Sequence, residues 1–147
     1  MFRLIAVVVA LISLASPALA QDDPTPPMSA QAIAETRPLT DRFFTALQAG
    51  EVSRAYTDLF AGTLAEGKTL ELQTLISQST FILQTYGPIT GWTLARTDCI
   101  TPTFCRVIFQ INTENGPIMV LMSLYRRSSG WVTTNILITD IATDLFD

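Results

Sequence analysis

The chain contains 147 residues, of which 48% are hydrophobic and 15% are charged. Its 9 basic and 13 acidic side chains give a formal charge of −4, which argues against a nucleic-acid partner because such binding depends on many Lys and Arg contacts to phosphates. The chain has no histidine, so catalytic triads and most zinc sites lack their commonest member. We therefore expect no identifiable catalytic residue, no metal site and no cofactor.

Residues 1–20 have the pattern of a secretory signal peptide. An arginine near the start is followed by an apolar run from Leu4 to Leu14 and by the small-residue ending ALA at 18–20. This pattern predicts cleavage after Ala20. An uncleaved membrane anchor is disfavoured because the apolar run is shorter than the roughly 20 residues that span a bilayer. The sequence therefore predicts a secreted protein, periplasmic in a Gram-negative source, with no membrane anchor after cleavage.

A leader and three helices follow. Residues 21–28 form a flexible Pro-rich leader by composition, and residues 29–147 have the length of a single domain. Ser29 is a candidate N-cap for the first helix, in which Pro38 marks either the first turn of a new helix or a kink in a longer one. The apolar spacing then predicts helices that end before Gly50 and near Phe60, and a third over about 70–86 with Thr69 as its N-cap.

The rest of the chain has the alternating period of β-strands. The predicted strands cover residues 92–99, 104–113, 118–127 and 131–140. Asn115-Gly116 predicts a two-residue hairpin turn in which both residues have positive φ. Helices followed by a sequential antiparallel meander predict an α+β domain, with three N-terminal helices packed on one face of a four-stranded antiparallel sheet.

The two cysteines are expected to form a disulfide. Cys99 and Cys105 are separated by five residues that include a proline, and an oxidising compartment favours their pairing across a hairpin. In that register Asp98 faces Arg106 and Ala95 faces Phe109, so that opposite charges and apolar side chains each meet. A redox pair is the functional alternative, but its usual C-x-x-C spacing at a helix start is absent.

Two groups of residues are candidates for binding. Arg96, Asp98 and Arg106 form either a polar ligand site or a solvated ion-pair network on one strand face. Arg126 and Arg127 are expected to be a solvated feature of a strand end. Six aromatic residues either line a ligand pocket between helices and sheet or belong to the core. These aromatic residues are Tyr56, Phe60, Trp92, Phe109, Tyr125 and Trp131.

Three segments carry a family resemblance. FFTALQAGEVSRAYTDLF at 43–60, YGPITGW at 86–92 and LYRRSSGWVTTNILITD at 124–140 resemble the NTF2-like superfamily, and in particular its small exported bacterial members. The resemblance covers residues 36–140. It implies a cone-shaped α+β fold, also described as cystatin-like, with a curved sheet around a long helix and a cavity between them. Enzymatic branches place a Tyr with Asp, or a His with Asp, in the cone, and this chain has no His and no Asp that matches such a position.

Three functions follow as hypotheses. The leading one is an exported, non-catalytic domain that binds a small apolar or amphipathic ligand, or a protein partner, in the cavity between helices and sheet. The second is a cone-pocket enzyme of the isomerase or dehydratase type, in which Tyr56 or Tyr125 works with a carboxylate. The third is a structural module that forms a homodimer through the exposed sheet.

Overall fold

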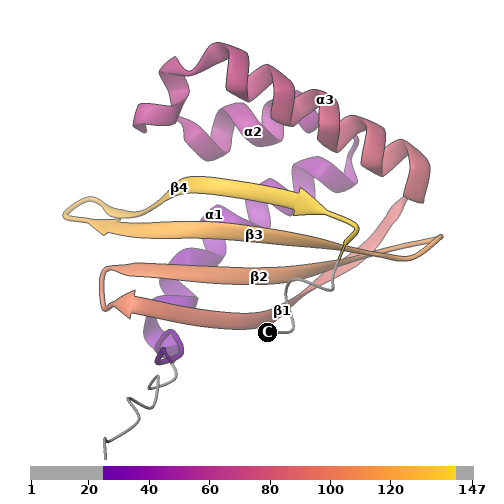
Figure 1. Ribbon diagram of the computed structural model, residues 1–147. Helices are drawn as coiled ribbons and strands as arrows, with labels where there is room; N and C mark the ends of the chain where they lie inside the picture. The colour runs from indigo at the N-terminus through magenta and orange to yellow at the C-terminus, as the bar shows by residue number, and fades with distance from the viewer. Residues whose placement is uncertain (1–24, 142–147) are drawn as a thin grey trace, which may run out of the picture.

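A computed structural model of the chain describes residues 25–141 and shows the predicted α+β architecture (Figure 1). The expected signal peptide and residues 21–24 of the leader lie outside the described residues. The helical part comprises α1 (Ala30–Gln48), α2 (Val52–Phe60), the short 3₁₀ helix η1 (Leu64–Gly67) and α3 (Thr69–Tyr86). The strands are β1 (Ile89–Thr101), β2 (Phe104–Thr113), β3 (Pro117–Arg127) and β4 (Gly130–Thr139). Among the described residues, no helix is both long and apolar enough to cross a bilayer.

Helix α1 is continuous through Pro38, which settles the two alternatives that the sequence left open. Ser29 is the N-cap, and its hydroxyl accepts a hydrogen bond from the Ala32 N–H at 3.2 Å. Pro38 has no N–H for the carbonyl four residues before it, yet its ring lies on the exposed side of the helix. Burial of Phe43, Phe44 and the neighbouring apolar side chains therefore stabilises a helix that local propensity alone would interrupt.

Helix α2 lies between α3 and the sheet (Figure 1). The Tyr56 hydroxyl of α2 and the Ser79 hydroxyl of α3 are hydrogen-bonded at 2.6 Å, and both residues are fully buried. The prediction of Thr69 as an N-cap was wrong. Thr69 is the first helical residue and Lys68 occupies the cap. Lys68 makes no side-chain cap bond, because its ammonium group has no lone pair to accept a backbone N–H.

The sheet is an open antiparallel meander in the order β1-β2-β3-β4. Cys99 pairs with Cys105 and Asp98 with Arg106, as predicted, and the disulfide is formed. The expected pairing of Ala95 with Phe109 was wrong. Leu94 faces Phe109 because a bulge between Leu94 and Arg96 leaves Ala95 as an extra residue.

The turn between β2 and β3 is longer than predicted. Regular pairing ends at Asn112 and Pro117, and the Thr113 N–H and hydroxyl both donate to the Gly116 carbonyl. Gly116 has a φ of 150°, but no non-glycine residue among those described has a positive φ, so Asn115 does not adopt the predicted conformation. Its N–H instead donates to the carbonyl of Tyr86 at 3.1 Å. This contact with the end of α3 overrides the local turn preference.

The core lies between the helices and one face of the sheet. Alternate residues of β2 and β3 point into it, and those of β3 are completely buried. Its fully buried members on β3 are Ile118, Val120, Met122 and Leu124. The opposite face carries exposed apolar side chains, including Ile100 and Leu137, together with the Asp98 cluster described below.

Residues 25–28 run along the free edge of β1. The Cys99 N–H donates to the Pro26 carbonyl at 2.8 Å, and the Met28 N–H donates to the Thr97 hydroxyl at 2.9 Å. Met28 is buried against the core. We call residues 25–28 the N-terminal strap, because they cover backbone groups that an edge strand otherwise leaves open.

Candidate functional site

The six aromatic residues do not share one cavity. Trp92 and Phe109 line a groove of about 270 Å³ between α1 and the first two strands. Phe44 stacks on Trp92 with ring centroids 5.5 Å apart and contacts Phe109 at 4.8 Å. We call this the α1 groove. It is lined by Ile33, Thr36, Arg37, Thr40, Asp41, Trp92, Leu94, Val107 and Phe109.

The buried polar groups of the α1 groove already have partners in the protein. The Trp92 indole N–H donates to Asp41 at 3.4 Å, and the Thr36 hydroxyl donates to the Ile33 carbonyl at 2.8 Å. The buried Thr40 hydroxyl lies 3.3–3.4 Å from two helix carbonyls. The groove therefore has an apolar wall, but no buried polar group in it requires a ligand.

Tyr56, Phe60 and Trp131 belong to the core. Tyr56 packs edge-on against Phe43 at 5.3 Å, and burial raises the pKa of its hydroxyl to about 12, although the hydrogen bond with Ser79 opposes this shift. The Trp131 indole N–H donates to Glu35 at 3.1 Å. These side chains stabilise the fold and have little exposed surface for a ligand.

The predicted polar cluster is present as an ion-pair network. Arg96 Nε and Arg106 Nη2 donate to the two oxygens of Asp98, each at 3.0 Å. Burial opposes ionisation of this carboxyl, but hydrogen bonds from Arg106 and Arg96 and their charges outweigh it and hold the pKa of Asp98 below its ordinary value. The cluster borders a hollow of about 290 Å³ beside the disulfide. Because the two arginines share one carboxylate, the cluster keeps a net charge of +1.

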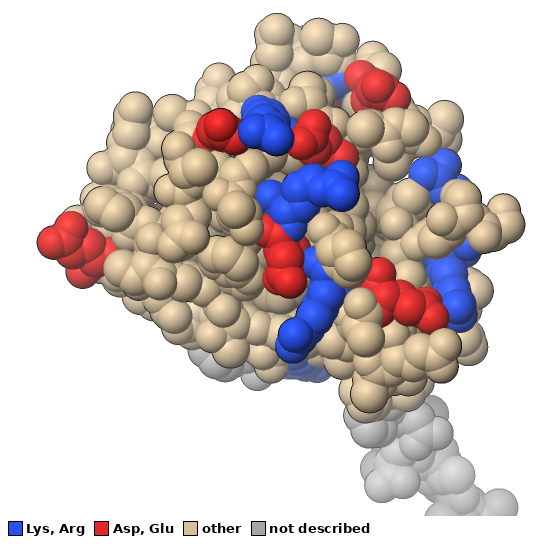
Figure 2. Space-filling model, turned by 180° about the vertical axis from the view of Figure 1, so that it is seen from behind, with Lys and Arg blue, Asp and Glu red and all other residues tan. Residues whose placement is uncertain are grey.

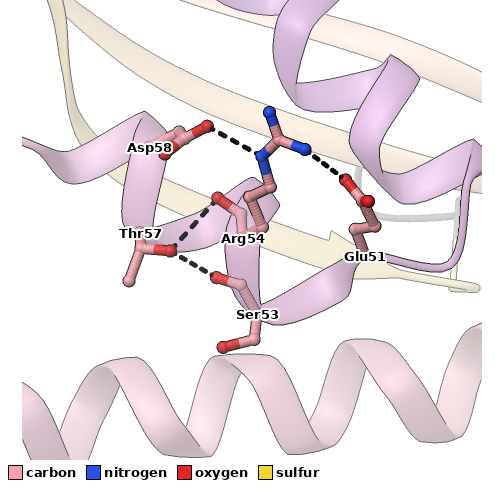
Figure 3. A network of polar contacts seen from close by, with 5 residues as sticks. All are labelled: Glu51, Ser53, Arg54, Thr57 and Asp58. Atoms are coloured by element: carbon pink, nitrogen blue, oxygen red, sulfur yellow. Dashed lines mark hydrogen bonds and ion pairs between the residues drawn. The ribbon is translucent and has the colours of Figure 1, made fainter.

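Charges on the helical side are mixed. Figure 2 shows acidic and basic side chains side by side on this face, without a continuous patch of either sign. On α2, Arg54 bridges Glu51 at 2.9 Å and Asp58 at 3.6 Å (Figure 3). The Arg54 side chain is 67% exposed, so these pairs contribute little to stability. This face has no continuous basic surface that could bind a polyanion.

The most distinctive hollow lies between η1 and the β3–β4 hairpin. Its volume is about 380 Å³, within the range of small-ligand sites. Tyr125 is the only one of the six predicted aromatic residues that lines it. We call it the hairpin pocket. It is lined by Thr63, Leu64, Ala65, Lys68, Tyr125, Arg127, Val132, Thr133 and Thr134.

A bulge in β4 shapes this pocket. Leu124 pairs with Thr133 and Ser123 pairs with Asn135, which leaves Thr134 as the extra residue. The Thr134 hydroxyl donates to the Ser123 carbonyl at 3.1 Å. Thr133 is fully buried, and its hydroxyl is the one buried side-chain polar group, within residues 25–141, that has no hydrogen-bond partner. Leaving a buried hydroxyl unpaired costs about 1–3 kcal/mol of stability. An unpaired group beside a pocket therefore calls for an explanation.

Two cations of the pocket come from different parts of the chain. Lys68 precedes α3, and Arg127 ends β3 and donates to the Gly62 carbonyl at 3.1 Å. Arg126 instead pairs with Glu35 at 3.2 Å on the other face of the strand. From the sequence, both arginines were expected to be one solvated feature of a strand end. The alternation of strand side chains could have separated them, but only the packing of η1 brings Lys68 to Arg127.

The tyrosine that contacts a carboxylate is Tyr86, which was not among the residues predicted to carry chemistry. The Tyr86 hydroxyl donates to Asp140 at 2.9 Å near the surface, and this bond raises the pKa of Tyr86. Tyr56 contacts Ser79 instead. No described residue places a carboxylate within hydrogen-bond distance of Tyr125, and no three potential metal ligands converge in the described part of the chain.

Comparisons of the chain with protein-family models, with curated proteins and with solved structures gave no match. The candidate site is therefore interpreted from its own residues, and the NTF2-like resemblance stays a proposal.

Proposed function

We propose that the protein is an exported binding domain of NTF2-like architecture that holds a small amphipathic ligand in the hairpin pocket. The observation that carries this proposal is a pocket of about 380 Å³ that combines apolar surface with two cations, beside the buried and unpartnered hydroxyl of Thr133. A ligand that reached this hydroxyl would satisfy a group that the protein leaves unpaired. Apolar walls with a few polar groups are typical of small-molecule sites.

Export is supported by the signal-peptide pattern and by the disulfide. The Cys99–Cys105 bond is compatible with an oxidising compartment outside the cytoplasm. Neither cysteine has the C-x-x-C context of a redox pair. A structural role for the bond therefore accords with a secreted binding domain.

Binding is favoured over the isomerase or dehydratase alternative. Tyr56, one of the two tyrosines proposed for catalysis, is buried in the core with its hydroxyl bonded to Ser79. Tyr125 lines the hairpin pocket, where none of the lining residues is an acid. The pocket thus offers hydroxyls and cations but no carboxylate to act as a general base with a tyrosine.

A titration followed by amide NMR tests the proposal. The ¹⁵N-labelled protein, expressed from the full chain, is titrated separately with 1-octanol, octanoate and octylammonium. We expect at least one of these amphiphiles to cause saturable shifts at the pocket residues Tyr125 and Thr134. Absence of saturable binding by all three, or shifts confined to the α1 groove around Trp92, would contradict it.

A pair of filling variants provides the control. Ala65→Trp adds bulk to the hairpin pocket and should abolish binding, whereas Ile33→Trp adds the same group to the α1 groove and should leave binding unchanged. Circular dichroism of both variants verifies that each is folded. Equal loss of binding in the two folded variants would argue against the hairpin pocket as the site.

A further inference from the structure

The hairpin pocket has a charge opposite to that of the whole chain. Acidic residues outnumber basic ones by 13 to 9, yet the pocket lining contains Lys68, Arg127 and no acid. Neither cation forms an ion pair with any residue described in the structure. Two cations without a counterion in one hollow favour an anionic ligand.

Donors of these cations remain free for such a ligand. Arg127 uses one guanidinium nitrogen on the Gly62 carbonyl, while a guanidinium has five N–H donors in total. The nearest acid in η1, Glu66, accepts a hydrogen bond from the Gly62 N–H at 2.8 Å. Glu66 forms no ion pair with Arg127 or Lys68, so both cations remain without a direct carboxylate partner.

The remaining walls suit a hydrocarbon. Leu64 is 95% exposed at the pocket, and Ala65 and Val132 add further apolar surface. Covering an exposed leucine removes apolar area from water and favours binding. The volume of about 380 Å³ corresponds to about a dozen water molecules, so a ligand of about ten non-hydrogen atoms would fit.

We propose that the ligand of the hairpin pocket is a small carboxylic acid with a hydrocarbon tail. Its carboxylate accepts hydrogen bonds from Lys68 and Arg127, and its tail covers Leu64 and Val132. This inference rests on the proposed binding function and adds the chemical class of the ligand. It gives the two cations a counterion and covers the exposed leucine in a single step.

Calorimetric titrations with octanoate, 1-octanol, octylammonium and acetate test the inference. We expect octanoate to bind at least tenfold more tightly than each of the other three, because only octanoate combines the negative charge with the tail. Equal or tighter binding of octanol or octylammonium would overturn the carboxylate assignment while leaving a binding function in place. If acetate bound as tightly as octanoate, the hydrocarbon tail would have no part in recognition. If no probe bound, the proposed binding function would be overturned as well.

Charge-removing variants locate the head group. Lys68→Gln and Arg127→Gln should each weaken octanoate binding about tenfold. The matched control is Arg126→Gln, which removes the adjacent cation on the opposite strand face and should change the affinity less than twofold. An unchanged affinity in both Lys68→Gln and Arg127→Gln, or an equal loss in Arg126→Gln, would overturn the proposed head-group site.

Discussion

At the scale of single residues, the hydroxyl of Thr133 is a buried polar group beside the hairpin pocket. Because this group is buried without a partner, Thr133→Val should raise the free energy of unfolding of the ligand-free protein by about 1 kcal/mol. Urea denaturation measures the change. The matched control is Thr40→Val, since the Thr40 hydroxyl is equally buried but bonded to helix carbonyls, and this variant should lose stability. A loss of stability in both variants would show that Thr133 has a partner in the folded protein.

The buried pair of Tyr56 and Ser79 predicts a stability that depends on alkaline pH. The hydroxyl of Tyr56 has a pKa of about 12 in the folded protein against the ordinary 10.0, so above pH 10 the unfolded chain releases a proton that the folded chain retains. The contribution of Tyr56 to the free energy of unfolding is therefore fully present below pH 10 and decreases as the pH rises further. By pH 12 the free energy of unfolding should be about 2 kcal/mol lower than near pH 8 because of this tyrosine.

Tyr56→Phe isolates this effect. Near pH 8 the variant should be about 1–2 kcal/mol less stable than the wild type, because it leaves the Ser79 hydroxyl unpaired. Above pH 10 the wild type should lose the advantage, so the two denaturation curves converge and then cross. A constant difference between pH 8 and pH 12 would contradict the raised pKa.

At the scale of secondary-structure elements, the disulfide joins β1 and β2 next to their connecting turn. It closes a loop of seven residues between Cys99 and Cys105, and on the loop-entropy description this contributes about 2 kcal/mol to stability. The double variant Cys99→Ala/Cys105→Ala should therefore lower the free energy of unfolding by about that amount while the strands remain paired. Denaturation of the variant and of the wild type measures the loss. An unchanged free energy of unfolding would contradict a stabilising role.

At the scale of the whole molecule, the N-terminal strap connects the start of the domain to the far edge of its sheet. Met28 is 4% exposed, and the flanking backbone bonds join the strap to β1. Met28→Ala should therefore reduce the free energy of unfolding by about 2 kcal/mol. The neighbouring Pro27 is exposed, and Pro27→Ala should change it by less than about 0.5 kcal/mol. Similar small effects of both variants would show that the strap does not stabilise the domain.

Predictions that depended on residues close in the sequence agree well with the structure. Helical and alternating spacing identified the three α-helices and four strands, because side-chain periodicity follows directly from local backbone geometry. The pairing of Asp98 with Arg106 followed in the same way, since a short hairpin leaves few registers. The predicted turn failed at Asn115, because its N–H bonds to the distant end of α3. The predicted pairing of Ala95 failed because a bulge in β1 changes the register.

The hairpin pocket could not be predicted from the sequence. Its walls come from residues 63–68 and 125–134, and no local pattern states that η1 packs beside that end of the sheet. The sequence by itself determined the α+β class, the strand order along the chain and the pairing of the cysteines. Only the tertiary structure placed Lys68, Arg127 and Thr133 at one pocket, because such a meeting depends on how helices and sheet pack over long sequence separations and not on the periodicity of any single segment.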